Sequence, residues 1–311
     1  MLKDLNNINN IIVFGNNMKK IILMCVLFIF LTSSISSSGA EILKNKSKEE
    51  LGSLDEKNYY ALIIGIEEYL GIPTPEQQYL DDSAIAIYEK LLNSSNWEKE
   101  NILLLLNENA TKEKIFDAIT VWLNDKETKD DIVLIYIATH GWKTKLSQKI
   151  YGNAYFITYN SSDYQYDKET KITDKEFDKW LDVLDSKHIA LILENCYSGK
   201  MLALRQSGRA IIAGGGRYIF CPCNWSIYLE DSIFGFFLRQ GLTGVADINN
   251  DKWITVREAF HYLRFPVIWH SMWYHFPYIY KTGYGLSFVG PQVPYLYDRH
   301  IGEIPLIKYK E

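Results

Sequence analysis

Two apolar runs of the sequence end in residues that can do covalent chemistry. The run DIVLIYIATHG delivers His140 and then Gly141, and the run HIALILENCYSG delivers Cys196 shortly before Gly199. A cysteine thiolate is a strong nucleophile, and a nearby imidazole can take the thiol proton and later return it to a leaving amine. The pair therefore indicates acyl-transfer chemistry, with Cys196 as the nucleophile and His140 as its acid/base partner.

Taken singly, each residue has an ordinary explanation. A lone cysteine at a strand end is usually a small buried hydrophobe, and a lone histidine is usually a packed or surface residue. Here both residues end a buried run and both stand close to a glycine, and this coincidence favours a joint catalytic role. We expect the backbone amides of Gly141 and Cys196 to point at a developing oxyanion.

The elements that must position these residues follow from the hydrophobic pattern. Both runs are short, rich in Ile, Leu and Val, and stopped by glycine, which is typical of a fully buried strand in a parallel sheet. In open α/β sheets the ligand crevice lies at the carboxyl ends of such strands. Further strands are predicted at Tyr59–Ile66, Asn101–Leu106, Arg209–Gly214 and Gly285–Gly290, with a small hairpin element at Ala154–Tyr159.

Helical spacing of apolar residues predicts helices between these strands. They begin near Asp81, at Thr111, at Thr173, at Ser232 and at Thr255, and the last two end near Leu242 and Leu263. Alternating strands and helices predict an α/β three-layer sandwich, with a mainly parallel central sheet and helices on both faces.

Composition and the chain ends limit the class of protein. The chain has 311 residues, of which 47% are hydrophobic, and a formal net charge of −5, which argues against a nucleic-acid partner. Residues 1–40 read as a secretory signal, with Lys19 and Lys20 before an apolar stretch and a small-residue cleavage site at Ala40. We expect a secreted or extracytoplasmic protein, which touches a membrane only if the signal stays uncleaved. Residues 41–57 form a charged leader, 58–290 the globular domain and 291–311 a C-terminal surface extension.

Cysteine usage fits an exported protein with one reactive thiol. Of the 4 cysteines, Cys25 leaves with the signal, so an odd number remains. Cys221 and Cys223 flank Pro222 and either form a small strained disulfide or stay reduced. Cys196 is the thiol left over.

The order strand, His-Gly, helix, strand, Cys-x-Ser-Gly resembles the caspase-fold cysteine peptidases, where the histidine precedes the cysteine by roughly 50 residues. The stretch from Glu194 to Met201 is similar to the Glu-Ala-Cys-Glu-Ser-Gly-Ser-Met stretch of legumains, the asparaginyl endopeptidases. Matches fall at Glu194, Cys196, Ser198, Gly199 and Met201. The resemblance extends over roughly Tyr59 to Gly290. It implies a caspase/haemoglobinase-like fold and a His140–Cys196 dyad that needs no third acid.

Two acidic residues are candidates for a substrate pocket. By the same resemblance, Glu194 would line a pocket for an Asn side chain; the alternative is a buried carboxylate held by backbone amides or by Arg217. Asp82 would meet a basic substrate side chain, as acidic pocket residues do in arginine- or lysine-specific relatives; the alternative is a helix cap. Legumains carry Asn-Tyr-Arg-His ahead of the first helix, whereas this chain has Glu76-Gln77-Gln78-Tyr79 in the corresponding loop.

One loop has the spacing of a calcium site. Asp247, Asn249, Asp251 and Glu258 fall at positions one, three, five and twelve of an EF-hand pattern. Lys252 replaces the glycine of the sharp turn and adds a positive charge, so a structural turn is favoured and calcium is the weaker alternative. We expect no other cofactor.

The leading hypothesis is an exported cysteine endopeptidase that hydrolyses peptide bonds in peptide or protein substrates through a thioester intermediate. Two alternatives remain: acyl transfer to an amine, as in the transamidases among legumain relatives, and an inactive caspase-like binding protein.

Overall fold

The computed structural model describes residues 57–72, 79–143, 154–162, 169–216, 225–226, 229, 231–275, 279–282, 285–288 and 291–309. The chain divides into two compact units, Met1–Gly52 and Ser53–Glu311, and every described residue belongs to the second. The predicted signal peptide and Cys25, nearly all of the leader, the Glu76–Gln78 stretch, Arg217, Cys221 and Cys223 lie outside the described residues.

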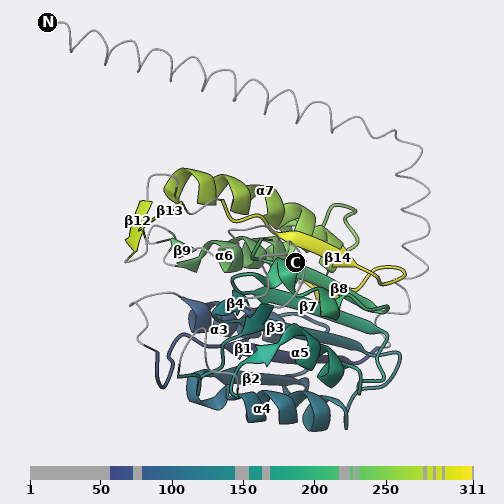
Figure 1. The fold of residues 1–311 in the computed structure, drawn as a ribbon. Helices are drawn as coiled ribbons and strands as arrows, with labels where there is room; N and C mark the ends of the chain where they lie inside the picture. The colour runs from purple at the N-terminus through teal and green to yellow at the C-terminus, as the bar shows by residue number, and fades with distance from the viewer. Residues whose placement is uncertain are drawn as a thin grey trace, which may run out of the picture. The chain divides into compact units, whose positions relative to one another are not determined.

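A six-stranded sheet forms the centre of this unit (Figure 1). Its order is β14-β8-β7-β3-β1-β2; five strands run parallel, and β14 runs antiparallel to β8. β1 and β3 are buried along their whole length because helices cover both faces of the sheet. The predicted α/β class with a mainly parallel sheet is confirmed. The strands are β1 (Tyr59–Gly65), β2 (Ile102–Leu106), β3 (Ile132–Ala138), β7 (His188–Glu194), β8 (Arg209–Ala213) and β14 (Tyr295–Asp298).

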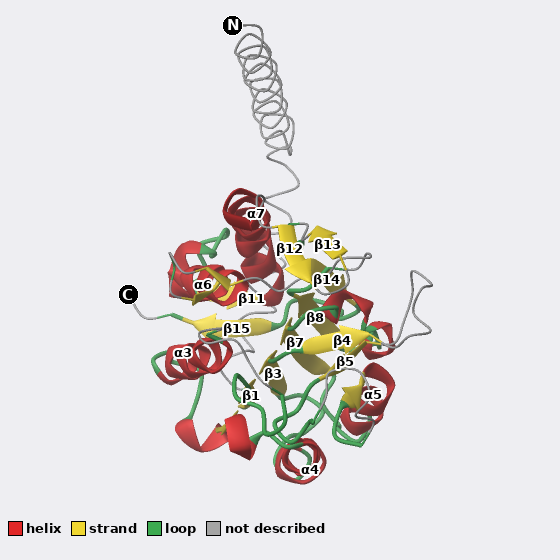
Figure 2. Cartoon of the chain, turned by 60° about the vertical axis from the view of Figure 1, so that its left-hand side comes forward, coloured by secondary structure: helices red, strands yellow, loops and turns green. Residues whose placement is uncertain are grey.

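Helices lie on both faces of the sheet, as Figure 2 shows. On one face α3 (Leu80–Leu92) packs on α6 (Ile233–Gln240), which packs on α7 (Val256–His275). On the other, α4 (Lys112–Asp117), its π-helical continuation η4 (Ala118–Leu123) and α5 (Asp174–Leu181) cover a large apolar core. The three layers agree with the predicted sandwich.

Short elements complete the described part of the chain. The predicted hairpin element is β5 (Ala154–Phe156), which pairs with β4 (Gly141–Lys143) and β6 (Ile172–Thr173). Three two-stranded sheets join β9 (Trp225–Ser226) with β10 (Asp231–Ser232), β11 (Trp253–Thr255) with β15 (Pro305–Lys308), and β12 (Ile279–Thr282) with β13 (Gly285–Phe288). The short helices are η2 (Lys99–Asn101), η3 (Asn107–Asn109), η5 (Ser198–Lys200), η6 (Leu202–Leu204) and η7 (Gly241–Val245).

Hydroxyl caps start four of the described helices, because each hydroxyl accepts a hydrogen bond from an amide that lacks an intrahelical partner. Thr111 caps α4, Thr173 caps α5 and Ser232 caps α6. Thr255 caps α7 in the same way, since its hydroxyl accepts from the amide of Glu258 at 3.3 Å. The helix starts predicted at Thr111, Thr173, Ser232 and Thr255 are confirmed.

The start of α3 differs from the prediction. Tyr79 precedes the helix at a φ of 60°, no side chain caps it from that position, and Asp81 and Asp82 already belong to its first turn. The amide of Leu80 instead donates to Glu67 Oε2 at 3.0 Å. The helix-cap alternative for Asp82 is therefore wrong: a carboxylate from the preceding loop takes that place.

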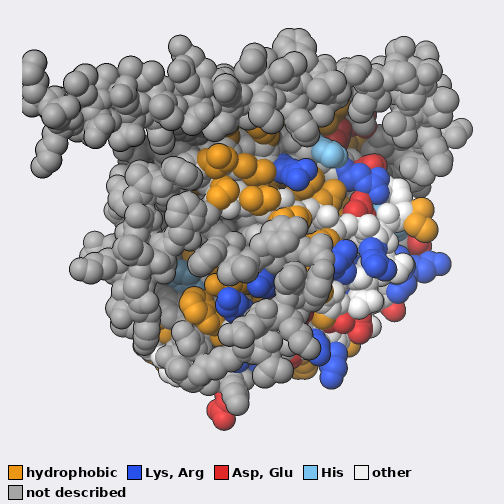
Figure 3. Space-filling model, turned by 45° about the horizontal axis from the view of Figure 1, so that its top comes forward, with side chains coloured by type: hydrophobic (Ala, Val, Ile, Leu, Met, Phe, Trp, Pro, Cys, Tyr) orange, Lys and Arg blue, Asp and Glu red, His pale blue; other side chains and the backbone are white. Residues whose placement is uncertain are grey.

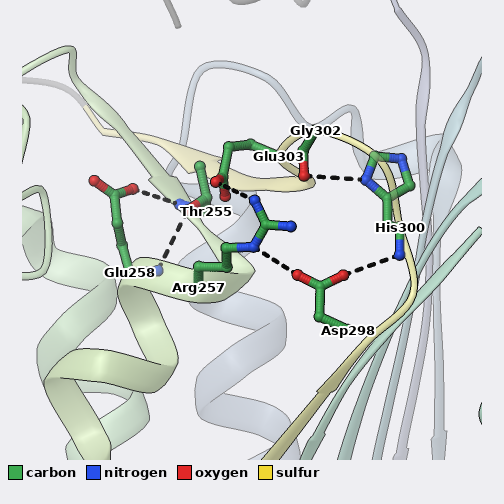
Figure 4. Close-up of polar contacts among 7 residues, drawn as sticks. All are labelled: Thr255, Arg257, Glu258, Asp298, His300, Gly302 and Glu303. Atoms are coloured by element: carbon green, nitrogen blue, oxygen red, sulfur yellow. Dashed lines mark hydrogen bonds and ion pairs between the residues drawn. The ribbon is translucent and has the colours of Figure 1, made fainter. Parts of the chain in front are cut away.

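The C-terminal segment, which is described over residues 291–309, differs from the predicted surface extension. It supplies β14 to the central sheet and β15 to a small sheet. Arg257, at the start of α7, donates to Asp298 at 2.6 Å and to Glu303 at 2.5 Å, which ties α7 to this segment (Figure 4). By contrast, the late strand predicted at Gly285–Gly290 is β13, which pairs with β12 outside the central sheet.

The helix α7 is longer than predicted and continues through Pro266 to His275. Phe265, Trp269 and Met272 on it are exposed, and Figure 3, which brings this side forward, shows hydrophobic side chains at the surface beside basic ones. Within the described ranges, no helix is long and apolar enough to cross a membrane.

Candidate active site

The two proposed catalytic residues stand at matching positions on neighbouring strands. Ala138 of β3 pairs in register with Glu194 of β7. His140 and Cys196 each follow two residues later, and the amide of Thr139 still donates to the carbonyl of Glu194 at 3.3 Å. Paired parallel strands lie about 4.8 Å apart. The structure thus brings the imidazole and the thiol to the same edge of the sheet, on adjacent strands.

Gly141 lies directly against the backbone of the Cys196 turn. A Cβ atom at position 141 would come within 2.2 Å of the Cys196 carbonyl oxygen and 2.5 Å of Asn195 Nδ2. The buried Asn195 amide nitrogen itself donates to the same carbonyl at 3.0 Å. Glycine is required here because any side chain would separate the two loops.

The turn after Cys196 has an unusual backbone conformation. Tyr197 has a φ of 63°, in the left-handed region that a bulky residue rarely adopts. The amides of Ser198 and Lys200 donate to the carbonyls of Asn195 and Tyr197, at 3.2 and 2.8 Å, and close the turn. Such backbone strain often occurs at functional sites, where the surroundings hold the conformation.

The glycine stretch after β8 supports this turn from behind. The amide of Gly215 donates to Ser198 Oγ at 2.7 Å, and the amide of Gly199 donates to the Gly215 carbonyl at 3.0 Å. Added Cβ atoms would clash on both sides: at Gly199 with Gly215 and Gly216, and at Gly215 with Asn195. Ser198 and Gly199 therefore position the Cys196 turn.

Aromatic side chains connect the two loops beside the proposed dyad. The rings of Trp142 and Tyr197 meet edge to face with centroids 5.8 Å apart, and Lys143 Nζ lies 5.3 Å from the Tyr197 ring centroid. Because Trp142 and Tyr197 are close to His140 and Cys196 along the chain, this contact keeps the two loops together.

His140 is held by its backbone and by an aromatic neighbour. Its amide donates to the Tyr69 hydroxyl at 2.9 Å, its carbonyl accepts from the amide of Ile157 at 2.9 Å, and the Tyr69 ring centroid lies 5.3 Å from that of the imidazole. Burial lowers the pKa of His140 to about 4. The imidazole is therefore neutral at pH 7, the state in which it can accept a proton.

Glu194 lies in the interior, on the side of the sheet that carries α3 and α6, and is fully buried. Its carboxylate accepts hydrogen bonds from the hydroxyls of Tyr136 and Ser232. Burial raises its pKa to about 7, although the two hydrogen bonds oppose the shift. Glu194 thus fits the second interpretation, a buried carboxylate, better than that of a pocket residue. Its hydrogen-bond partners are the hydroxyls of Tyr136 and Ser232, whereas we expected backbone amides or Arg217.

The surroundings of Glu194 join three elements. Ser83 of α3 donates to Asp231 Oδ1 at 3.1 Å, and Arg239 of α6 forms an ion pair with the same carboxylate. Asp82, the other pocket candidate, lies on the exposed first turn of α3. The structure thus leaves Asp82 at the surface and does not bring it together with Glu194 in one pocket.

The calcium-like loop uses its acidic side chains as acceptors for backbone amides. Asp247 and Asn249 accept from the amide of Asp251 at 3.2 and 2.9 Å, and Asp251 accepts from that of Trp253 at 2.8 Å. The Glu258 carboxylate accepts from the amide of Thr255 at 3.0 Å, and the Thr255 hydroxyl accepts from the amide of Glu258 at 3.3 Å. The two bonds form a capping box that starts α7 (Figure 4). These bonds describe a structural turn, and the described part of the chain has no group of three His, Cys, Asp or Glu residues placed to hold a metal ion.

A surface groove of about 560 Å³ lies along the edge strand β2 and the helix α4. Its lining includes Leu104, Lys114 and Trp122 but no residue of β3, β7 or the loops that follow them. The groove is therefore separate from the candidate active site.

Sequence reasoning missed two residues of the site, Tyr69 and Asn195. Asn195 directly precedes Cys196, and this position in the sequence is the only feature that could have pointed to it. Tyr69 meets His140 across a sequence separation of 71 residues, and nothing in the local pattern distinguishes it from other loop tyrosines.

Comparison with known proteins identifies no family. No family model matches the sequence, and no curated protein matches it. Among solved structures, the protein GSU0716 from Geobacter sulfurreducens is similar, with 13% sequence identity and a TM-score of 0.48. The match covers 66% of this chain and 88% of that one.

Proposed function

We propose that this protein is a cysteine endopeptidase in which Cys196 attacks the peptide carbonyl and His140 transfers the protons. The observation that carries the proposal is the strand register: both residues lie two positions beyond the Ala138–Glu194 pair, on adjacent strands. Adjacent strand ends deliver the nucleophile and the base to one edge, where open α/β sheets bind ligands. Cys196 is only partly buried, as is expected of a residue that must meet a substrate.

The reaction proceeds by two acyl transfers. The Cys196 thiol gives its proton to His140 as its sulfur bonds to the substrate carbonyl carbon. The carbon–nitrogen bond then breaks, His140 protonates the leaving amine, and a thioester remains on Cys196. Water gives a proton to His140 as its oxygen bonds to the thioester carbonyl carbon. The carbon–sulfur bond then breaks, the acid product leaves, and His140 returns the proton to the Cys196 sulfur.

The neutral state of His140 decides how the first acyl transfer begins. A preformed thiolate–imidazolium pair requires a protonated histidine, whereas burial favours the uncharged ring. We therefore propose that His140 acts as a general base while substrate is bound. The amides of Gly141 and Cys196, at the same edge of the sheet, are proposed as the oxyanion donors.

We further propose an affiliation with the caspase-fold peptidases of legumain type, and export through the N-terminal signal. The family proposal is supported by the matches at Cys196, Ser198 and Gly199 and by their roles in the turn. Because Glu194 is fully buried and bonded to hydroxyl groups, its contacts do not support a role in recognising an Asn side chain.

A peptide-cleavage assay tests the function. The purified protein is incubated with a combinatorial peptide mixture beside Cys196→Ala, His140→Ala and the matched control His188→Ala, which removes a partly buried histidine at the opposite end of β7. Products are identified by mass spectrometry. We expect cleavage by the wild type and the control and none by the two dyad variants; cleavage by Cys196→Ala would refute the assignment.

The same assay separates the alternatives. With an added amine nucleophile, transfer products in place of hydrolysis products would identify a transamidase. Absence of both products, together with absence of thiol labelling at Cys196, would favour a binding protein.

A further inference from the structure

A closed ring of hydrogen bonds surrounds the backbone of His140. The His140 amide donates to the Tyr69 hydroxyl at 2.9 Å, and that hydroxyl lies 2.8 Å from Thr139 Oγ1. Thr139 Oγ1 donates to the Ile157 carbonyl at 2.6 Å, and the Ile157 amide donates back to the His140 carbonyl at 2.9 Å. Three residues from three segments of the chain, Tyr69, Thr139 and Ile157, thus hold both backbone polar groups of His140.

Tyr69 is the member of this ring that comes from farthest away. It lies between β1 and α3, is 9% exposed, and its hydroxyl also lies 3.0 Å from the Ile66 carbonyl, a second acceptor for its single proton. The loop around it is fixed in turn, since the Leu70 amide donates to the Tyr159 carbonyl at 2.9 Å. The Tyr69 hydroxyl is therefore an acceptor with a fixed position for the His140 amide.

We infer that Tyr69 is a positioning residue for His140: its hydroxyl fixes the backbone, and its ring fixes the place of the imidazole relative to Cys196. The inference rests on the proposed function, because positioning matters for a proton transfer between these two side chains. Tyr69 acts through His140, and we assign it no contact with the substrate.

The ring of hydrogen bonds requires a tyrosine at position 69. Phenylalanine can pack against the imidazole at the same centroid distance of 5.3 Å, but it offers no oxygen to accept from the His140 amide. The substitution Tyr69→Phe therefore removes the backbone anchor and keeps the ring contact. Tyr309→Phe is a matched control, because it removes a tyrosine hydroxyl that bonds to Asp247 at 2.9 Å in the calcium-like loop.

We expect Tyr69→Phe to lower kcat by roughly tenfold to a hundredfold with KM changed less than about twofold, because a small displacement of a catalytic group affects the chemical step more than binding. Tyr309→Phe should leave both unchanged. Thr139→Val should lower kcat and Thr139→Ser should restore it. In the double variant Tyr69→Phe/Thr139→Val, the two losses should not add, since both break one ring.

A second readout does not depend on peptide cleavage. The His140 titration is followed by NMR, and the alkylation rate of Cys196 by iodoacetamide is measured against pH. In Tyr69→Phe, water reaches the loosened imidazole, so the His140 pKa should rise from about 4 toward its ordinary value of 6.5. The alkylation profile should move with it.

The outcomes separate the inference from the proposed function. If Cys196→Ala still cleaves peptide, the proposed function fails whatever Tyr69→Phe does. If Cys196→Ala is inactive but Tyr69→Phe matches the wild type in kcat, in the His140 titration and in the alkylation profile, the role of Tyr69 is overturned and the peptidase proposal stands.

Discussion

Gly141 touches the carbonyl oxygen of Cys196 so closely that a Cβ atom on it would lie 2.2 Å away. The residue after the proposed base and the proposed nucleophile itself are thus in backbone contact. The loops that follow β3 and β7 therefore behave as one unit, and a change in the spacing of one is transmitted to the other.

The substitution Gly141→Ala tests this contact. The new methyl group must push the Cys196 carbonyl or Asn195 aside, and we expect a loss of about 1–3 kcal/mol in the free energy of unfolding together with loss of peptide cleavage. Urea denaturation measures the first and the peptide assay the second. Gly241→Ala is the control, because its nearest neighbour is a Tyr262 ring atom at 3.0 Å, a side chain that can move. Equal effects of the two substitutions would contradict the account.

Removal of the Ser198 hydroxyl should weaken the turn that carries Cys196. In Ser198→Ala the buried Gly215 amide loses its acceptor at 2.7 Å, which costs about 1–3 kcal/mol of stability. Because Ser198 supports the turn and transfers no proton, we expect a partial decrease in kcat. Thermal unfolding and steady-state kinetics measure the two effects, and complete inactivation of a stable Ser198→Ala protein would show a direct catalytic part.

Burial of Glu194 predicts a pH dependence of stability. Its pKa is about 7 in the folded protein against an ordinary value of 4.5, so the folded state holds the proton more tightly than the unfolded state. Its contribution to stability is therefore present below pH 4.5 and is lost as the pH rises to about 7, by on the order of 3 kcal/mol. Glu194→Gln, which cannot ionise, should lack this loss.

Denaturant unfolding from pH 4.5 to 8 measures the difference between the wild type and Glu194→Gln. The exposed change Glu89→Gln serves as the control and should follow the wild-type curve. Parallel curves for the wild type and Glu194→Gln would show that Glu194 does not titrate in this range.

The neutral His140 imidazole predicts the acid limb of the activity profile. Because its pKa is about 4, His140 keeps its capacity to accept the thiol proton down to that pH. We expect kcat/KM to fall as the pH drops through about 4, since a protonated imidazole cannot act as a base. A fall centred near 6.5 would mean that water reaches the imidazole in solution.

The strands that carry the site were predicted from the sequence within one or two residues. β1, β3 and β7 are continuous apolar runs that glycine or polar residues stop, and the starts of α4 and α5 have threonine caps that can be recognised locally. A short, continuous apolar run of this kind fits a strand that is buried on both faces and few other elements. The shared edge of His140 and Cys196 followed from this order of strands.

Features that depend on distant contacts were not predictable. β14 is four residues long and partly exposed, so its place at the edge of the central sheet depends on pairing with β8. The start of α3 is decided by Glu67, whose carboxylate accepts a hydrogen bond from the amide of Leu80, thirteen residues later. Likewise Tyr69 and Glu194 acquire their roles from neighbours that only the folded chain supplies.

The most direct test of the central claim is to trap the acyl intermediate. The protein is mixed with a cleaved peptide, quenched in acid within one turnover, and analysed by intact mass and peptide mapping. We predict an adduct with the mass of the N-terminal product less water on Cys196, forming at least about a thousandfold more slowly in His140→Ala. An adduct on another residue, or cleavage that persists in Cys196→Ala, would contradict the account.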